Sequence, residues 1–214
     1  MRRIPLVILA LSICCAPALA QKWEVEPYAG GLWLTNFNNV LDFRNPGIFG
    51  VKGGGYLTDH FMLEGNVGYL NQFTFGGYDY KSHGLLYEVA GSYNFFGNRL
   101  GGVFPFVTLG LGGLSVGNES LINGNDSNAA VYVVPLAVPV FTGSPIPRTL
   151  DALVVEDGDT FFNFSYGGGV KAARLWGPMG FRADVRGRTM PNFFGKTVNS
   201  FELTGGLLFS WGER

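Results

Sequence analysis

The sequence contains few side chains that could act as a nucleophile or a general base. Its two histidines are His60 and His83, and His83 follows the hydroxyl-bearing Ser82. A hydroxyl beside an imidazole is the minimum arrangement for acyl transfer or hydrolysis. His60 falls in a short turn-like segment, so we expect the histidines at opposite ends of the fold. We therefore predict no enzymatic activity, and Ser82 with His83 is the pair to test first.

Other ligand motifs point the same way. The glycine clusters at 53–55 and 167–169 lack the Gly-Lys-Ser/Thr ending and the following helix of a phosphate-binding loop. Both cysteines, Cys14 and Cys15, lie in the N-terminal segment described below, so the mature chain has no thiolate to offer a metal. The sequence predicts no cofactor and no metal site.

The charged residues follow a different pattern, because many of them alternate with apolar residues. In the segment 181–186, Arg182, Asp184 and Arg186 alternate with Phe181, Ala183 and Val185. Alternation with period two places all three charges on one face of a β-strand. The same reasoning gives a set of charged residues that share the inner face of a sheet, namely Glu24, Glu26, Lys52, Glu64, Glu88, Lys171, Arg182, Asp184, Arg186 and Glu202.

The elements that carry these charges are predicted to be eight antiparallel strands. Their approximate ranges are 22–34, 47–57, 60–72, 83–96, 103–116, 161–174, 178–190 and 198–211. Short turn-like links alternate with longer connections at about 35–46, 73–82, 117–160 and 191–197. Short turns on one side and long loops on the other are typical of a transmembrane up-and-down barrel, which is the fold class we predict.

The N-terminus indicates export. Arg2 and Arg3 precede an apolar stretch that is too short to span a bilayer as a helix, and Ala18-Leu19-Ala20 is a cleavage site, so 1–20 is predicted to be a signal peptide. A lipoprotein site at Cys14 is the alternative, although Ile13 fits it poorly. Removing Arg2 and Arg3 from the 15 basic residues leaves 13 against 16 acidic residues, a net charge of −3. This charge does not suit a nucleic-acid partner.

Composition supports a membrane location for residues 21–214. Glycines number 33, aromatic residues make up 15% of the chain, and charged residues make up only 14%. With no long apolar run, the chain can satisfy its backbone polar groups in a bilayer by closing a barrel. Trp23 and Trp33, ten residues apart on one face, would be separated by about 23 Å along the membrane normal, close to the height of an outer-membrane apolar band. Trp23 and Trp33 would lie in the two aromatic girdles. The other residues predicted for the periplasmic girdle are Phe95, Phe104, Phe181 and Trp211, and those predicted for the outer girdle are Tyr69, Phe162 and Phe201.

An eight-stranded barrel is only wide enough for side chains to fill its interior. Interleaved acids and bases inside it would pair and close the lumen, whereas charges of one sign would be very costly. The leading interpretation is therefore an ion-paired network that holds the barrel together. A narrow ion or proton path and catalysis are the alternatives, and in a soluble barrel the same charges would point outward.

Three segments resemble the OmpA-like superfamily of small outer-membrane barrels. Residues 47–69 resemble its second hairpin, and 104–113 resemble its fifth strand. The terminal pattern Thr204-x-Gly206-x-x-Phe209-x-Trp211 resembles the signal read by the barrel-assembly machinery, although Gly212, Glu213 and Arg214 follow it. The resemblance implies an integral outer-membrane barrel, but not the peptidoglycan-binding domain of full-length OmpA.

The insertion at 117–160 is the least explained segment. Its apolar stretch, 130–141, is broken by Pro135 and Pro139. It could form an extracellular hairpin, a cap over the barrel mouth, or two further strands of a ten-stranded barrel. A projecting or capping loop is the preferred interpretation, because loops this long are often functional.

These observations predict a non-enzymatic integral outer-membrane barrel of structural or surface-interaction type. The alternatives are an enzyme that modifies lipid A, a small porin, and a soluble barrel that binds an apolar ligand. Expected partners are outer-membrane lipid and lipopolysaccharide and, during biogenesis, periplasmic chaperones and the barrel-assembly machinery. No extracellular partner can be named from the residues.

Overall fold

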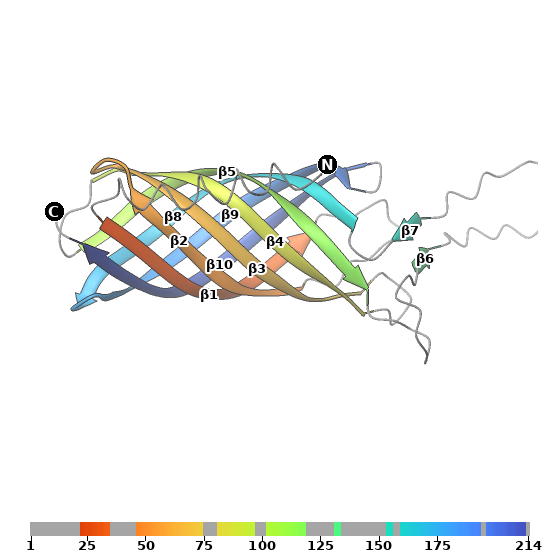
Figure 1. Ribbon diagram of the computed structural model, residues 1–214, viewed down its shortest axis with the longest axis horizontal. Helices are drawn as coiled ribbons and strands as arrows, with labels where there is room; N and C mark the ends of the chain where they lie inside the picture. Colours follow the sequence, from red (N-terminus) through yellow and green to blue (C-terminus); the bar gives the residue numbers. More distant parts are fainter. Residues whose placement is uncertain are drawn as a thin grey trace, which may run out of the picture.

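The computed structural model describes residues 22–34, 46–74, 81–96, 102–118, 131–133, 153–155, 159–193 and 196–212. The predicted signal peptide lies outside these ranges. Eight long strands wind around a common axis (Figure 1). They are β1 (Lys22–Leu34), β2 (Gly47–Tyr56), β3 (Phe61–Thr74), β4 (Lys81–Asn94), β5 (Gly102–Asn118), β8 (Asp159–Trp176), β9 (Met179–Phe193) and β10 (Lys196–Gly212).

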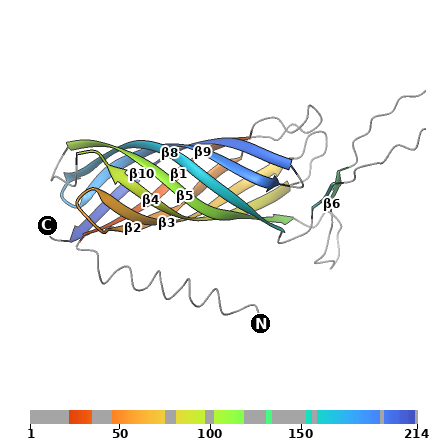
Figure 2. The same ribbon diagram turned by 90° about the horizontal axis from the view of Figure 1, so that it is seen from above.

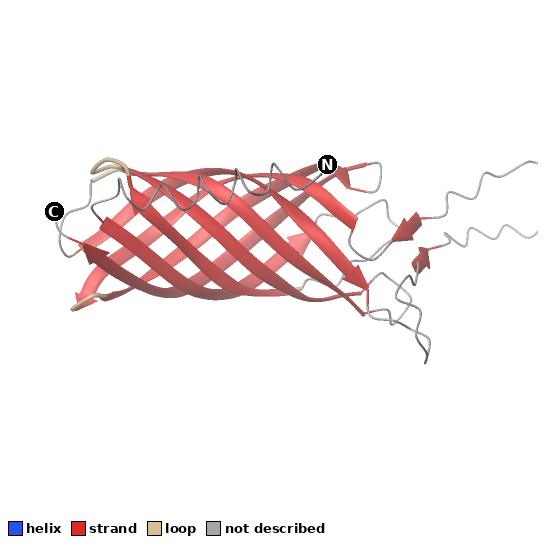
Figure 3. Cartoon of the chain, in the orientation of Figure 1, coloured by secondary structure: helices blue, strands red, loops and turns tan. Residues whose placement is uncertain are grey.

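The strands close into a barrel in the order β1-β10-β9-β8-β5-β4-β3-β2, and every neighbouring pair is antiparallel. Closure pairs the first strand with the last, so the barrel has no exposed edge. All regular elements of the described chain are strands (Figure 3). The predicted closed antiparallel barrel of eight strands is confirmed.

The ten-stranded alternative is wrong. Two short strands in the insertion, β6 (Val131–Val133) and β7 (Leu153–Val155), pair only with each other, as a separate two-stranded sheet. Three residues are too few to cross the apolar band, which needs about 9–11 residues per strand. Figure 2 shows this hairpin beyond one end of the barrel.

The two ends of the barrel differ in their connections. Lys22 pairs with Gly212, so both ends of the described barrel lie at one mouth, which we call the periplasmic mouth. The β8–β9 turn at the same mouth places Gly177 at a φ of 63°, a left-handed conformation that favours glycine at the first central position of a type II′ hairpin turn. At the other mouth, the outer mouth, the predicted loop at 191–197 is shorter than expected. The ladder between β9 and β10 extends to the pair Phe193 and Lys196. The register shifts between Lys196 and Val198, as at a β-bulge, and pairing resumes beyond the shift.

Side chains alternate between the lumen and the outer face along every barrel strand. In β9 the even-numbered residues from Gly180 to Met190 are buried and the odd-numbered ones are more exposed. The outer face is largely apolar, while charged and polar side chains are buried inside. This inversion of a soluble protein is the pattern of a barrel whose outer face meets lipid. The described residues include no helix that is both long and apolar enough to cross a membrane.

Candidate functional site in the barrel lumen

Strand β9 supplies the basic core of the lumen. Arg182, Arg186 and Arg188 occupy alternate positions around Asp184, so all four side chains point inward. The neighbouring strand β8 places Gly167 opposite Arg186 and Gly169 opposite Asp184. Because side chains alternate along a strand, the four charged residues of β9 form one row inside the barrel. The glycines of β8 carry no side chain, so they leave space beside this row for the long arginines.

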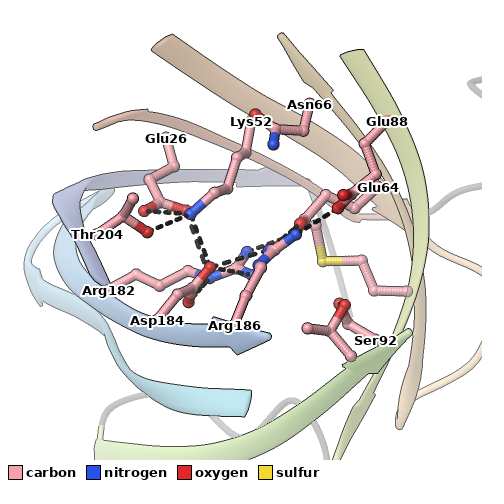
Figure 4. Close-up of polar contacts among 12 residues, drawn as sticks. Glu26, Lys52, Glu64, Asn66, Glu88, Ser92, Arg182, Asp184, Arg186 and Thr204 are labelled. Atoms are coloured by element: carbon pink, nitrogen blue, oxygen red, sulfur yellow. Dashed lines mark hydrogen bonds and ion pairs between the residues drawn. The ribbon is translucent and has the colours of Figure 1, made fainter. Parts of the chain in front are cut away.

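Asp184 and Glu64 form the centre of the network (Figure 4). Asp184 accepts hydrogen bonds from Lys52 Nζ at 2.7 Å, Arg182 Nε at 2.9 Å and Arg186 Nη2 at 2.9 Å. Glu64 accepts from Arg186 Nη2 at 2.8 Å and from Arg182 Nη1. Each carboxylate therefore joins at least two bases, and charge-assisted bonds of this kind are stronger than neutral ones.

The network continues toward the outer mouth through Glu88. This carboxylate accepts from Arg186 Nη1 at 2.6 Å and also from Arg188 Nη1. Arg188 Nε donates to Glu202 at 2.6 Å, and its Nη1 donates to Asn163 Oδ1 at 3.1 Å. Charges from β4, β9 and β10 are thus linked across the lumen.

A smaller cluster lies at the periplasmic mouth. Lys171 Nζ donates to Glu24 at 2.9 Å and to the Tyr56 hydroxyl at 2.6 Å, and that hydroxyl donates to Glu24 at 2.9 Å. Lys22 Nζ lies 3.8 Å from Glu24. One carboxylate is therefore shared by two lysines and a phenol.

Glu26 is held more loosely than the other acids. Its oxygens lie 3.6 Å from Lys52 Nζ and 3.4 Å from Arg182 Nε, and neither has a hydrogen-bond partner among the described residues. A Cβ atom at Gly206 would come within 2.9 Å of this carboxylate. Glycine at 206 thus provides the space that Glu26 occupies.

Charge inside the lumen is balanced. The buried charged residues of the described chain are six acids (Glu24, Glu26, Glu64, Glu88, Asp184, Glu202) and six bases (Lys22, Lys52, Lys171, Arg182, Arg186, Arg188). Each of the twelve lies within 4 Å of an opposite charge. Removing one member would leave a buried charge uncompensated, which typically costs about 3–5 kcal/mol.

The structure places all ten predicted lumen residues inside the barrel, and it adds residues that sequence reasoning missed. Lys22 and Arg188 complete the charge balance. Both could have been found by parity, since Lys22 precedes Glu24 by two positions and Arg188 follows Arg186 by two. Tyr28 and Tyr56 are also inside, although nothing in their residue type distinguishes a lumen tyrosine from a girdle tyrosine.

The aromatic residues predicted for the girdles lie on the outer face, with one exception. Trp33, Tyr69, Phe95 and Phe181 are exposed to the surroundings of the barrel and Trp23 is half-buried. The assignment of Phe104 to the periplasmic girdle is wrong. Its side chain is buried in an apolar cluster with Ala173 and Leu208, because it shares the inward parity of β5.

The histidines lie at opposite mouths. His60 Nδ1 is 2.8 Å from the Asn94 carbonyl oxygen, beside the periplasmic mouth, and its ring stacks on Tyr93. His83 pairs with Gly117 near the outer mouth and stacks on Tyr69. The side chain of Ser82 lies outside the described residues. Among the residues that the structure describes, no group of three or more His, Cys, Asp or Glu could hold a metal ion.

The residues of the terminal pattern face both sides of β10. Thr204 points inward and accepts a hydrogen bond from Lys52 Nζ at 3.0 Å, and Gly206 leaves room for Glu26. Phe209 and Trp211 stack at 6.1 Å between ring centroids, with Trp211 exposed to the lipid side. Thr204 and Gly206 therefore have contacts in the finished barrel, whatever their part in assembly.

A family profile described as "Outer membrane protein beta-barrel domain" matches residues 6–206. The chain belongs to this family. The superfamily resemblance and the integral outer-membrane location are thereby confirmed.

Two solved structures share the architecture of this outer-membrane barrel. The outer membrane protein OprG from Pseudomonas aeruginosa has a TM-score of 0.58 and 10% identity, over 91% of this chain and 97% of that chain. Neisserial surface protein A (NspA) has a TM-score of 0.54 and 14% identity, over 87% of this chain and 96% of that chain. At such identities the similarity shows the fold alone. A search of curated proteins gave no match.

Proposed function

We propose that this protein is a non-enzymatic outer-membrane barrel of structural or surface-interaction type, with a lumen closed by ion pairs. The observation that supports the proposal is the balanced set of six acids and six bases that crosses the lumen. In an open pore these side chains would be separated by water, whereas here Arg186 alone contacts Glu64, Glu88 and Asp184. Its partners would then be outer-membrane lipid and lipopolysaccharide, with any cell-surface contact made by the outer connections.

The proposal predicts no stable conductance. We expect the purified protein, reconstituted in planar lipid bilayers, to give no reproducible channel steps. A porin of established conductance, reconstituted in the same way, is the control that shows the measurement can detect a channel. Steps of constant size in the unaltered protein would favour a small porin instead.

The lipid A-modifying enzyme remains the second hypothesis from the sequence, and no contact among the described residues favours it. The two histidines are separated by the length of the barrel. We expect deletion of the gene to leave the lipid A mass spectrum unchanged. A lost or added acyl chain would contradict the proposal, and His83→Ala would then show whether the outer histidine is responsible.

A further inference from the structure

The lumen is divided into levels along the barrel axis. Following paired residues around the barrel from Glu24 gives Gly54, Glu64, Ala90, Gly110, Ser165, Arg188, Ser200 and finally Leu34. One circuit therefore returns to β1 ten residues nearer the outer mouth. Such a stagger is required to close a tilted sheet. Once this shift is allowed for, the positions of inward residues on different strands can be compared along the barrel axis.

At the outer level, the inward residues of five adjacent strands are all aliphatic. Ile48 pairs directly with Leu70, and Leu86 pairs directly with Leu114. Leu32 lies two residues from Gly30, the partner of Ile48, and Leu86 lies two residues from Gly84, the partner of Leu70, so the five form one arc. Beyond this arc, toward the outer mouth, the buried side chains are also apolar, namely Val116, Met190, Phe193 and Val198.

This outer apolar layer is packed tightly. The nine side chains range from 0% exposed, at Leu70, to 3% exposed, at Phe193 and Val198. The polar residues of this region, Arg188 and its hydrogen-bond partner Asn163, lie on the periplasmic side of Met190. No charged residue of the described lumen lies beyond the layer.

The periplasmic mouth also holds the apolar cluster of Phe104, Ala173 and Leu208, but there charged side chains continue beside it to the end of the barrel. Lys22 is the first residue of β1 and contacts Glu24, which contacts Lys171. Lys22 and Phe104 are each 7% exposed and Tyr56 is 6% exposed, more than any side chain of the outer apolar layer. A charged side chain at a mouth can be solvated from that mouth.

We propose that the outer apolar layer is a hydrophobic seal, and that water and small ions reach the charged lumen from the periplasmic mouth only. An apolar constriction blocks ions by excluding water, whereas ion pairs can exchange partners with water and solutes. The seal and the network are thus separate barriers in series. This goes beyond the proposed function, which does not say from which side the lumen is accessible.

Single cysteines can test the two barriers, because the chain has no cysteine after Cys15. Ser165→Cys places a reporter below the seal, at a hydroxyl with no hydrogen-bond partner among the described residues. Ser210→Cys places a reporter at the periplasmic level, and Thr197→Cys provides an exposed control at the outer rim. Each variant is first checked for faster gel mobility when unboiled, so that only folded barrels are compared.

A small, charged, membrane-impermeant thiol reagent is then added to intact cells. We expect it to label Thr197→Cys, and to label Ser165→Cys and Ser210→Cys at rates at least tenfold lower. Admitting the reagent to the periplasm should label Ser210→Cys. Adding Leu70→Ala and Leu86→Ala to the Ser165→Cys protein should raise its external labelling at least tenfold, whereas adding Glu64→Gln should not.

Three results would overturn the inference. External labelling of Ser165→Cys at the rate of the Thr197→Cys control would show an open outer mouth. Exposure by Glu64→Gln but not by the leucine substitutions would make the ion pairs the barrier. Failure of the reagent to label Ser210→Cys from the periplasm would show that the lumen is not accessible from the periplasmic mouth. None of these results alone bears on catalysis or on surface contacts, so the proposed function is tested separately.

Discussion

Asp184 is the acid on which three bases of the lumen converge. Asp184→Asn keeps the shape of the side chain and removes its charge, so Lys52, Arg182 and Arg186 lose a shared counter-ion. We expect a loss of about 3–5 kcal/mol in the free energy of unfolding. Urea unfolding in detergent micelles, followed by loss of the faster unboiled band, measures it.

The matched control is Ser92→Ala. Ser92 is also buried in the lumen, but it donates one neutral hydrogen bond, to Thr108 Oγ1 at 3.2 Å, whose loss costs about 1 kcal/mol. Equal losses for the two variants would show that the charges of the network do not govern stability.

The periplasmic cluster permits a test of pairing. Lys171→Met leaves Glu24 with Lys22 at 3.8 Å and the Tyr56 hydroxyl, and Glu24→Gln leaves Lys171 without its carboxylate. Because each single change leaves a buried charge underpaired, the double variant should lose less stability than the sum of the two, by at least about 1 kcal/mol. Strict additivity in the urea midpoints would mean that the pair is not coupled.

Contacts between neighbouring strands depend on outward glycines covered by aromatic rings. The ring of Tyr166 on β8 lies over Gly187 on β9, where an added Cβ would come within 2.7 Å of ring atoms. Gly187→Ala should therefore cost about 1–3 kcal/mol of stability. Gly205→Ala is the control, because its nearest neighbour would be a carbonyl oxygen at 3.9 Å, and we expect little change or a slight gain. A larger loss at Gly205 would contradict the packing argument.

The elements could be predicted from the sequence because charges mark the inner face. In β9, arginine and aspartate at every second position fix both the strand and its orientation. In β5, Val103, Phe104, Phe106 and Val107 are all apolar, so period two does not say which pair meets lipid, and the structure buries Phe104 and Phe106 inside. The contacts of the network were not predictable, because pairs such as Lys52 with Asp184 are 132 residues apart and depend on the register of the closed barrel.

For the molecule as a whole, no strand pairing among the described residues joins the insertion to the barrel. The barrel ladders use β5 up to Asn118, on its β4 side, and β8 from Asp159, while β6 and β7 pair only with each other. Stability of the closed barrel should therefore be independent of the insertion, since no backbone hydrogen bond of its ladder comes from β6 or β7.

Replacing residues 121–156 by a short Gly/Ser linker tests this independence. We expect the shortened protein to reach the outer membrane, to keep the faster unboiled band, and to unfold within about 1 kcal/mol of the full chain, because long surface connections affect stability only weakly. Deleting 209–212 is the contrasting variant. It removes Phe209 and Trp211 with Ser210 and Gly212, the four partners of 22–25, so it should prevent closure between β1 and β10. Loss of the fast band in the linker variant would show that the insertion is part of the folding unit. If the fast band is kept, the insertion can be replaced without altering the lumen.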